Sequence, residues 1–182
     1  MKGPKGSKVK ITVNRDGTLI PFEIIRDKIP VNCIDAAFMI DDRTGYIKLS
    51  KFTRTTYKEF TDATEKLVAQ GMKRLLFDLR DNTGGYFDQA LRLSNEFLQD
   101  GDRIVYMEGR QRPRQDFDAD GRGSLQDIKL SVLIDEGSAS SSEIFAGAIQ
   151  DNDRGTIIGR RSFGKGLVQQ QMPFRDGSAL RL

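Results

Sequence analysis

The chain has 182 residues, of which 37% are hydrophobic and 30% charged, so it is long enough to bury the core of one domain. Its net charge of only +3 comes from 29 basic and 26 acidic residues that are interspersed, which does not favour nucleic acid or an anionic membrane as a partner. Cys33 stands alone, which excludes an internal disulfide and a cysteine-based metal site. No apolar run is long enough to predict an integral membrane segment.

The first segment has the pattern of a β-hairpin. Val9, Ile11 and Val13 alternate with polar residues, and Asp16-Gly17 supplies a turn before a second apolar stretch. An extended stretch is expected at residues 29–31, and a domain boundary near Pro30.

Strands and helices alternate in the rest of the chain. Apolar residues at helical spacing predict a helix at 55–70, and Gly71 is placed to end it in a left-handed conformation. Further elements follow from apolar runs and turn residues: strands at 36–40, 46–49, 75–79, 104–107 and 130–134, and helices at 90–98 and 140–150. This alternation predicts an α/β layered core, in which ligands gather at the strand ends.

Two strand ends carry residues suited to acyl transfer. The chain has no histidine, so a serine nucleophile needs another base, and a lysine in a dry pocket is the known alternative. Ser140 begins a predicted helix, where its hydroxyl and the amide of Ser141 lie at the positive end of the helix dipole. Gly84 or Gly85 can supply the second amide of an oxyanion hole. These residues predict a serine–lysine hydrolase with Lys165 as base.

Each of these features also has a structural interpretation. Ser140 and Glu143 form the pattern of a helix capping box. Gly84-Gly85 is typical of a turn, and a lysine between two glycines is typical of a solvated loop. Three other serines leave the identity of the nucleophile open: Ser138, Ser141 and Ser142.

Two other motifs are rivals. Residues 159–165 copy most of a phosphate-binding P-loop, but Gly166 replaces the serine or threonine that would hold magnesium. Residues 116–127 resemble a calcium loop, but no helical pattern flanks them. We expect a polar loop between strands there, and no metal or organic cofactor.

Four blocks of the sequence together resemble the carboxy-terminal processing peptidases, which are the tail-specific proteases of family S41. The blocks occur in the family's order and span nearly the whole chain: Gly3–Val9, Asp78–Gly85, Ser138–Ile144 and Phe163–Gln169. The resemblance implies that Ser140 is the nucleophile, Lys165 the general base and Gln169 the residue that orients the lysine.

The resemblance also implies a crotonase/ClpP-like layered protease core. Residues 1–30 would be the C-terminal strands of a truncated PDZ-like domain, left as a remnant hairpin. Residues 31–182 would be a peptidase core truncated at its C-terminal end, with a strand at 179–182. The expected function is an endopeptidase that cleaves protein substrates near their C-termini through an acyl-enzyme. The family implies a periplasmic or cell-envelope location, and a homo-oligomer stays open.

Two alternatives keep the fold without the protease activity. The chain could be a catalytically silent peptide-binding or interaction module, because losing the PDZ groove can leave Ser140 and Lys165 unaligned. A crotonase-type acyl-CoA enzyme would share the oxyanion chemistry, but it would not need the set of Ser140, Lys165 and Gln169.

Overall fold

The computed structural model describes residues 2–27, 32–169 and 171–181. The chain divides into two compact units, Met1–Val31 and Asn32–Leu182. In the first unit, β1 (Lys8–Arg15) and β2 (Thr18–Ile25) form an antiparallel hairpin. Asp16 and Gly17 join them with φ angles of 52° and 83°, the two left-handed residues that a tight hairpin turn requires. The predicted hairpin is confirmed, and the extended stretch expected at 29–31 lies outside the described residues.

The second unit is built on a five-stranded sheet with the order β3-β4-β5-β8-β9. β3 is antiparallel to β4, and the remaining neighbours are parallel. The strands have these bounds: β3 Ile34–Met39, β4 Thr44–Leu49, β5 Arg74–Asp78, β8 Lys129–Ile134 and β9 Thr156–Gly159. The α/β class expected from the sequence is therefore observed.

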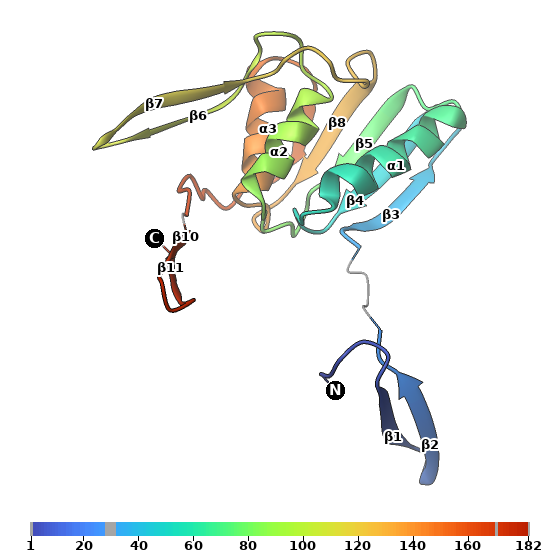
Figure 1. Ribbon diagram of the computed structural model, residues 1–182. Helices are drawn as coiled ribbons and strands as arrows, with labels where there is room; N and C mark the ends of the chain where they lie inside the picture. Colours follow the sequence, from blue (N-terminus) through green and yellow to red (C-terminus); the bar gives the residue numbers. More distant parts are fainter. Residues whose placement is uncertain (1, 28–31, 170, 182) are drawn as a thin grey trace. The chain divides into compact units, whose positions relative to one another are not determined.

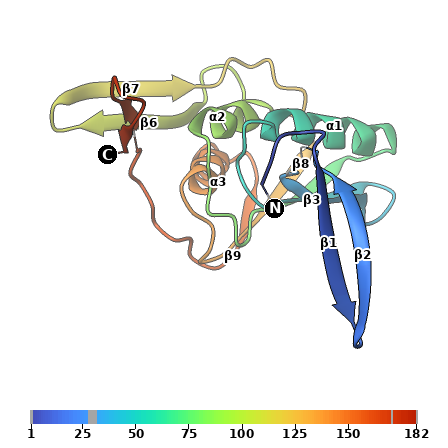
Figure 2. The same cartoon turned by 60° about the horizontal axis from the view of Figure 1, so that its bottom comes forward.

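Three helices connect the parallel strands: α1 (Thr56–Ala69), α2 (Phe87–Asn95) and α3 (Ser141–Asp151). Right-handed crossovers that advance in one direction across a sheet place their helices on one face, and Figures 1 and 2 show all three helices on the same side. The carboxyl ends of β5 and β8 thus lead into loops at one edge of the sheet.

Helix α1 shows why these residues form these elements. Its buried residues recur every three or four positions: Thr56, Phe60, Thr64 and Leu67. Gly71 follows the helix with a φ of 104°, as predicted for a left-handed stop. Among the described residues, no helix combines the length and the apolar composition that crossing a membrane would take.

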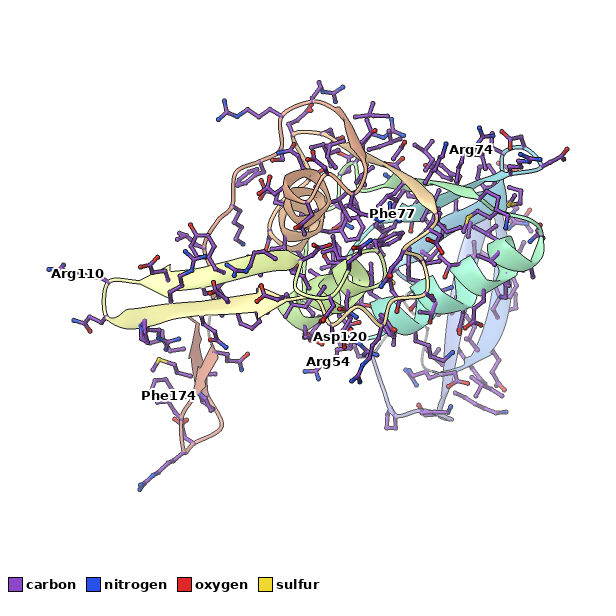
Figure 3. All side chains as sticks on the ribbon, turned by 90° about the horizontal axis from the view of Figure 1, so that it is seen from above. Arg54, Arg74, Phe77, Arg110, Asp120 and Phe174 are labelled. Carbon is purple, nitrogen blue, oxygen red and sulfur yellow. The ribbon has the colours of Figure 1, made fainter. Side chains whose placement is uncertain are left out.

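Four phenylalanine rings form the centre of the core between the sheet and the helices. Phe77 of β5 contacts Phe60 and Phe145 edge to face, with ring centroids 5.2 and 5.1 Å apart. Phe97 closes the cluster, 6.1 Å from Phe60 and 5.7 Å from Phe145. Edge-to-face rings add about 1 kcal/mol per pair to their burial. One ring comes from each of four places: α1, β5, α3 and the segment that follows α2. The cluster therefore joins the helices to the sheet, and Figure 3 labels Phe77 at its centre.

Some strands were not predicted, and β7 (Arg112–Asp118) is one of them. It pairs with β6 (Arg103–Gly109), which confirms the strand predicted at 104–107, in a ribbon whose far end carries Arg110 in Figure 3. The polar loop expected at 116–127 is therefore wrong for residues 116–118. Arg103 of β6 forms ion pairs with Asp116 and Asp118 of β7, so cross-strand charge pairs replace the apolar alternation that usually marks a strand.

The other strands missed are β9 and β10 (Gln171–Pro173). β10 pairs with β11 (Ala179–Arg181). The strand predicted at 179–182 is confirmed for residues 179–181, and residue 182 lies outside the described residues. Both missed strands are short, and a run of three or four residues carries little periodicity.

The ring cluster leads to a prediction about stability. Phe145 is fully buried, so Phe145→Ala should lower the free energy of unfolding by about 3–5 kcal/mol through lost burial and the cavity left behind. Phe174→Ala removes the same atoms from a ring that is 55% exposed and should change stability little. Urea unfolding followed by circular dichroism measures both, and equal losses would contradict the assignment of the core.

Candidate active site

The candidate site lies where β5 and β8 end. The two strands pair in parallel, with Asp78 opposite Leu133, so the loop after β5 (residues 79–86) and the loop after β8 (residues 135–140) meet at one edge of the sheet. The carboxyl edge of an α/β sheet is where ligands usually bind.

Asn82 holds the two loops together. Its side chain is fully buried, donates to the carbonyl of Leu49 at 2.8 Å and accepts from the amide of Gly84 at 2.9 Å. Its backbone carbonyl accepts from the amide of Ala139 at 3.0 Å and from the hydroxyl of Ser142 at 2.8 Å. One residue of the β5 loop thus sets the position of the segment on either side of Ser140.

Asp135 makes a second connection from the end of β8. Its carboxylate accepts from the amides of Asp81 at 2.9 Å and Gly137 at 3.0 Å. Burial alone would raise the pKa of this carboxyl, but these hydrogen bonds and one from Ser138 hold the pKa below its usual value. Asp135 is therefore ionised at neutral pH and links both loops as an acceptor.

The structure separates the four serines that the sequence could not rank. Three are buried and donate their hydroxyls to backbone carbonyls: Ser138 to Leu79, Ser141 to Gly85 and Ser142 to Asn82. Ser140 is only partly buried, and within the described residues its hydroxyl donates to no acceptor. Ser140 is therefore the serine of this group whose hydroxyl proton is available.

The backbone of Ser140 is strained. Its φ of 56° and ψ of −113° lie outside the regions that side-chain-bearing residues normally adopt, at a cost of about 1–3 kcal/mol. Such strain persists where neighbouring contacts determine it, and it clusters at functional sites. The sharp turn presents Ser140 directly before α3, as expected from its place at the helix start.

The candidate oxyanion residues lie against Ser140. A side chain on Gly84 would meet the Cβ of Ser140 and the amide nitrogen of Ser141, each at 2.8 Å. The amide of Gly84 is already bonded to Asn82, whereas the amides of Gly85 and Ser141 have no acceptor among the described residues. The geometry therefore leaves Gly85 and Ser141 as the free pair of donors.

Lys165 is joined to Ser140 through Glu143. The Glu143 carboxylate accepts from the backbone amide of Ser140 and from that of Lys165, both at 2.8 Å, so the expected capping role of Glu143 is present. Lys165 and Gln169 are exposed, and within the described residues their side chains contact neither each other nor Ser140 through a hydrogen bond. The structure brings the Lys165 backbone to the site and leaves Gln169 apart.

Asp78 anchors the start of the β5 loop. Its carboxylate is fully buried and accepts from Tyr46 Oη at 2.7 Å and from Arg80, with the shortest contact to Nη2 at 2.6 Å. Lys48 Nζ lies 3.7 Å away. Burial would raise the pKa of Asp78, but the hydrogen bonds of Arg80 and Tyr46 lower it to about 2. Asp78 and its partners Tyr46, Arg80 and Lys48, called here the Asp78 clamp, lie immediately before the part of the loop that carries Gly84 and Gly85.

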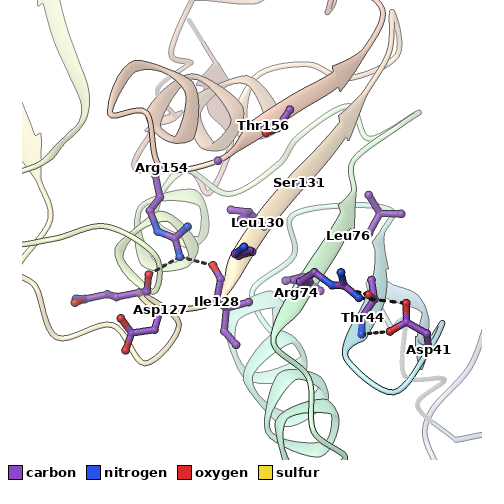
Figure 4. A pocket seen from close by; sticks show the side chains of 14 residues that line it. Asp41, Thr44, Arg74, Leu76, Asp127, Ile128, Leu130, Ser131, Arg154 and Thr156 are labelled. Carbon is purple, nitrogen blue, oxygen red and sulfur yellow. Dashed lines mark hydrogen bonds and ion pairs between the residues drawn. The ribbon is translucent and has the colours of Figure 1, made fainter.

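A pocket of about 650 Å³ lies at the opposite edge of the sheet (Figure 4). It is lined by the first residues of the parallel strands, Thr44, Arg74, Lys129 and Thr156. Arg154 borders it and donates to the carbonyls of the 125–128 turn. This hollow is therefore separated from Ser140 by the length of the sheet, and Arg154 is occupied in holding a turn.

The rival motifs do not have the surroundings that they need. A P-loop joins a strand to a helix, but residues 160–169 follow β9 without forming a helix. In the calcium-like segment, Asp116 pairs with arginines and Asp120 accepts from Asn95 and the amide of Arg122. The described residues contain no cluster of carboxylate, cysteine or histidine side chains suited to hold a metal ion.

Comparison with known proteins gives the family. Residues 43–182 match peptidase family S41. The chain is 37% identical over 185 residues to a carboxyl-terminal-processing protease of Synechocystis, covering 99% of this chain and 43% of the relative. It is 40% identical over 189 residues to a carboxy-terminal-processing protease of Bartonella bacilliformis, covering 100% and 43%. The chain belongs to peptidase family S41.

Solved structures agree with this assignment. The photosystem II D1 C-terminal processing protease superposes with a TM-score of 0.72 at 30% identity, covering 99% of this chain and 50% of that chain. A lipoprotein from Streptococcus agalactiae matches with a TM-score of 0.63 at 15% identity, which shows the shared fold alone. The chain thus spans half or less of the length of the processing proteases that it matches.

Sequence reasoning did not assign a role to Asn82 or Asp135, and it interpreted Glu143 only as a helix cap. Each residue follows a strand or opens a helix next to a candidate catalytic residue. The sequence does show polar residues just after predicted parallel strands. It does not show that they are buried, because burial cannot be read from a single turn-rich segment.

The Asp78 clamp predicts a pH dependence of stability. The pKa of Asp78 is lowered from 3.8 to about 2 in the folded protein, so its stabilisation is complete above about pH 4 and is lost as the pH falls toward 2. The difference corresponds to about 2 kcal/mol. Asp78→Asn should remove this part of the acid sensitivity, and Tyr46→Phe should reduce it. Unfolding free energies measured between pH 5 and pH 2 test this, and an unchanged slope in Asp78→Asn would refute it.

Proposed function

We propose that this chain carries the catalytic core of a serine endopeptidase that processes protein substrates near their carboxyl termini. Ser140 is the nucleophile, Lys165 the general base and Gln169 the residue that orients the lysine. The amides of Ser141 and Gly85 form the oxyanion hole.

One observation carries the proposal: the strained Ser140, with an available hydroxyl proton, stands at the start of α3 beside two unpaired amides. Each neighbouring serine donates its proton to a carbonyl. The first turn of a helix favours negative charge, so an oxyanion formed beside Ser141 is stabilised there. The names of the relatives, which are processing proteases, support the reaction class.

The proposed reaction is acyl transfer. Neutral Lys165 takes the Ser140 hydroxyl proton while Oγ attacks the peptide carbonyl carbon, and the carbonyl electron pair moves onto the oxygen between the two amides. As the tetrahedral species collapses, the C–N bond breaks and the leaving amine takes the proton from Lys165. Water then attacks the ester carbon and gives a proton to Lys165. As this second tetrahedral species collapses, the bond between the carbonyl carbon and Ser140 Oγ breaks and Oγ takes the proton back from Lys165, which releases the new carboxyl terminus and restores both residues. The step needs the neutral amine, and exclusion of water around Nζ by the bound substrate favours that form.

The finer fold assignment is part of the proposal. We take residues 31–182 as a crotonase/ClpP-like layered core, and residues 1–30, with the β1–β2 hairpin, as the closing strands of a PDZ-like domain. The five-stranded sheet with its helical crossovers on one face suits the first assignment, and the second rests on the sequence resemblance. An extracytoplasmic, envelope location likewise rests on the resemblance, and protein chains are the proposed partners.

The rival is a catalytically silent peptide-binding module with the same fold. A fluorophosphonate probe distinguishes the two, because it reacts only with an activated serine. Labelling confined to Ser140 supports the peptidase, whereas a folded protein that does not label supports the binding module. Acyl-CoA turnover without labelling would instead support a crotonase-type enzyme.

The central prediction concerns the serine–lysine pair. In the longest natural form of the protein that contains this sequence, Ser140→Ala and Lys165→Ala should each reduce degradation of an unstructured protein by roughly 10⁴-fold, because either change removes the activated nucleophile. Gln169→Ala should cause a smaller loss, since it acts through the lysine. Substrate degradation is followed by gel, and folding by circular dichroism.

Two substitutions serve as matched controls. Ser131 lies on β8 and lines the pocket at the amino ends of the parallel strands, and Lys66 lies on the exposed face of α1. The variants Ser131→Ala and Lys66→Ala should therefore degrade substrate at the parent rate. Retained activity in folded Ser140→Ala or Lys165→Ala would mean that another residue performs that step.

A further inference from the structure

One carboxylate collects four hydrogen bonds at the centre of the candidate site. Glu143 Oε1 accepts from Ser162 Oγ and from the amide of Gly164, both at 2.7 Å. Glu143 Oε2 accepts from the amides of Ser140 and Lys165, both at 2.8 Å. A single side chain of α3 thus holds the backbone of the proposed nucleophile and the backbone of the proposed base.

We propose that Glu143 is the positioning residue that assembles the serine–lysine pair. This inference rests on the proposed function, because it assigns to Glu143 the task of presenting Lys165 to Ser140. Glu143 does not touch the reacting atoms, and its effect passes through the two backbone segments that it joins.

The segment that carries Lys165 has few other attachments. Residues 161–165 form neither helix nor strand. Apart from the three bonds to Glu143, the hydrogen bond described for this segment runs from the amide of Phe163 to the carbonyl of Ser138 at 3.0 Å. Removing the Glu143 carboxylate therefore leaves Lys165 without a fixed backbone position. A displacement of about 1 Å at a reacting group can slow a reaction about 100-fold.

The chemistry of the four donors requires a carboxylate. Burial would raise the pKa of Glu143, but the hydroxyl of Ser162 and the amides of Lys165, Gly164 and Ser140 lower it below the usual value. Both oxygens therefore accept at neutral pH. A glutamine would place its NH₂ group against at least one backbone amide. Even on the side of Ser162, whose hydroxyl can turn to accept, the amide of Gly164 would face an N–H group and lose its acceptor.

A structural role as a helix cap is the competing explanation, and the length of the side chain separates the two. Glu143→Asp retains a negative charge in the first turn of α3, where it stabilises the helix. The shortened side chain lacks one methylene and cannot reach both Ser140 and the 162–165 segment. Capping predicts that Glu143→Asp restores the reaction, whereas positioning predicts that it does not.

The experiment measures the rate of fluorophosphonate labelling at Ser140 for the parent, Glu143→Gln and Glu143→Asp, together with the melting temperature and hydrogen exchange of residues 162–165. We expect both variants to label about 100-fold more slowly. Glu143→Asp should retain a melting temperature close to the parent's while the Gly164 and Lys165 amides lose protection. With a peptide substrate, kcat should fall while KM stays within about two-fold.

Glu136→Gln is the matched control. Glu136 makes a bidentate ion pair with Arg160, which precedes the same segment, but its side chain is 70% exposed, and such pairs contribute little. It should label at the parent rate.

Labelling at the parent rate by folded Glu143→Gln or Glu143→Asp would overturn the positioning role and leave the proposed function intact, provided that Ser140→Ala does not label. If the labelling rate of a variant fell only in proportion to its loss of folded protein, the positioning role would also be overturned. A parent protein that does not label would overturn the proposed function, and the positioning role with it.

Discussion

The site depends on the hydrogen bonds of a buried amide. Asn82 bonds to the carbonyl of Leu49, to the amide of Gly84 and, through its own carbonyl, to the segment that contains Ser140. A buried polar group without partners is costly, by about 1–3 kcal/mol. The lowest-energy arrangement is therefore the one in which both loops meet around Asn82. The loop at 79–86, called here the glycine loop, and the loop at 135–140 are thereby fixed relative to each other.

The same constraint explains how a strained serine persists. The left-handed backbone of Ser140 is unfavourable by itself, but the residues on both sides are held independently. Ala139 bonds to Asn82 before it, and Ser141 and Ser142 bond to the glycine loop after it. The network thus leaves one hydroxyl proton free while it engages the other three. Which of the four serines keeps an available hydroxyl proton is therefore decided by its burial and by the position of nearby carbonyl acceptors.

The two edges of the sheet hold their loops with different groups, carboxylates at the carboxyl edge and an arginine at the amino edge. At the carboxyl edge, buried Asp78 and Asp135 each accept several donors and hold loops in place. At the amino edge, Arg154 holds the turn at 125–128 by donating to its carbonyls, and the hollow there is lined by none of the proposed catalytic residues. The hollow alone would point to the amino edge, whereas strain, free amides and an available hydroxyl make Ser140 at the carboxyl edge the candidate nucleophile.

Much of the fold was readable from local patterns. The alternation of Val9, Ile11 and Val13 predicted the first hairpin, and the apolar spacing from Phe60 to Leu67 predicted α1 with its stop at Gly71. β7 was missed because its pattern is charged, and its partner Arg103 lies in another strand. A strand whose stability comes from cross-strand pairs carries no periodicity of its own.

The sequence by itself determined the chemistry that was available: a chain without histidine, with Ser140 at a helix start, a Gly84-Gly85 turn and Lys165 between glycines. It could not decide which serine keeps its proton, which glycine amide stays free, or what joins Lys165 to Ser140. Those answers depend on contacts between segments far apart in the chain, such as Glu143 with Lys165 and Asn82 with Gly84 and Ala139. Only the tertiary structure brings these groups within hydrogen-bonding distance, and a hydrogen bond requires that distance to be set within a few tenths of an ångström.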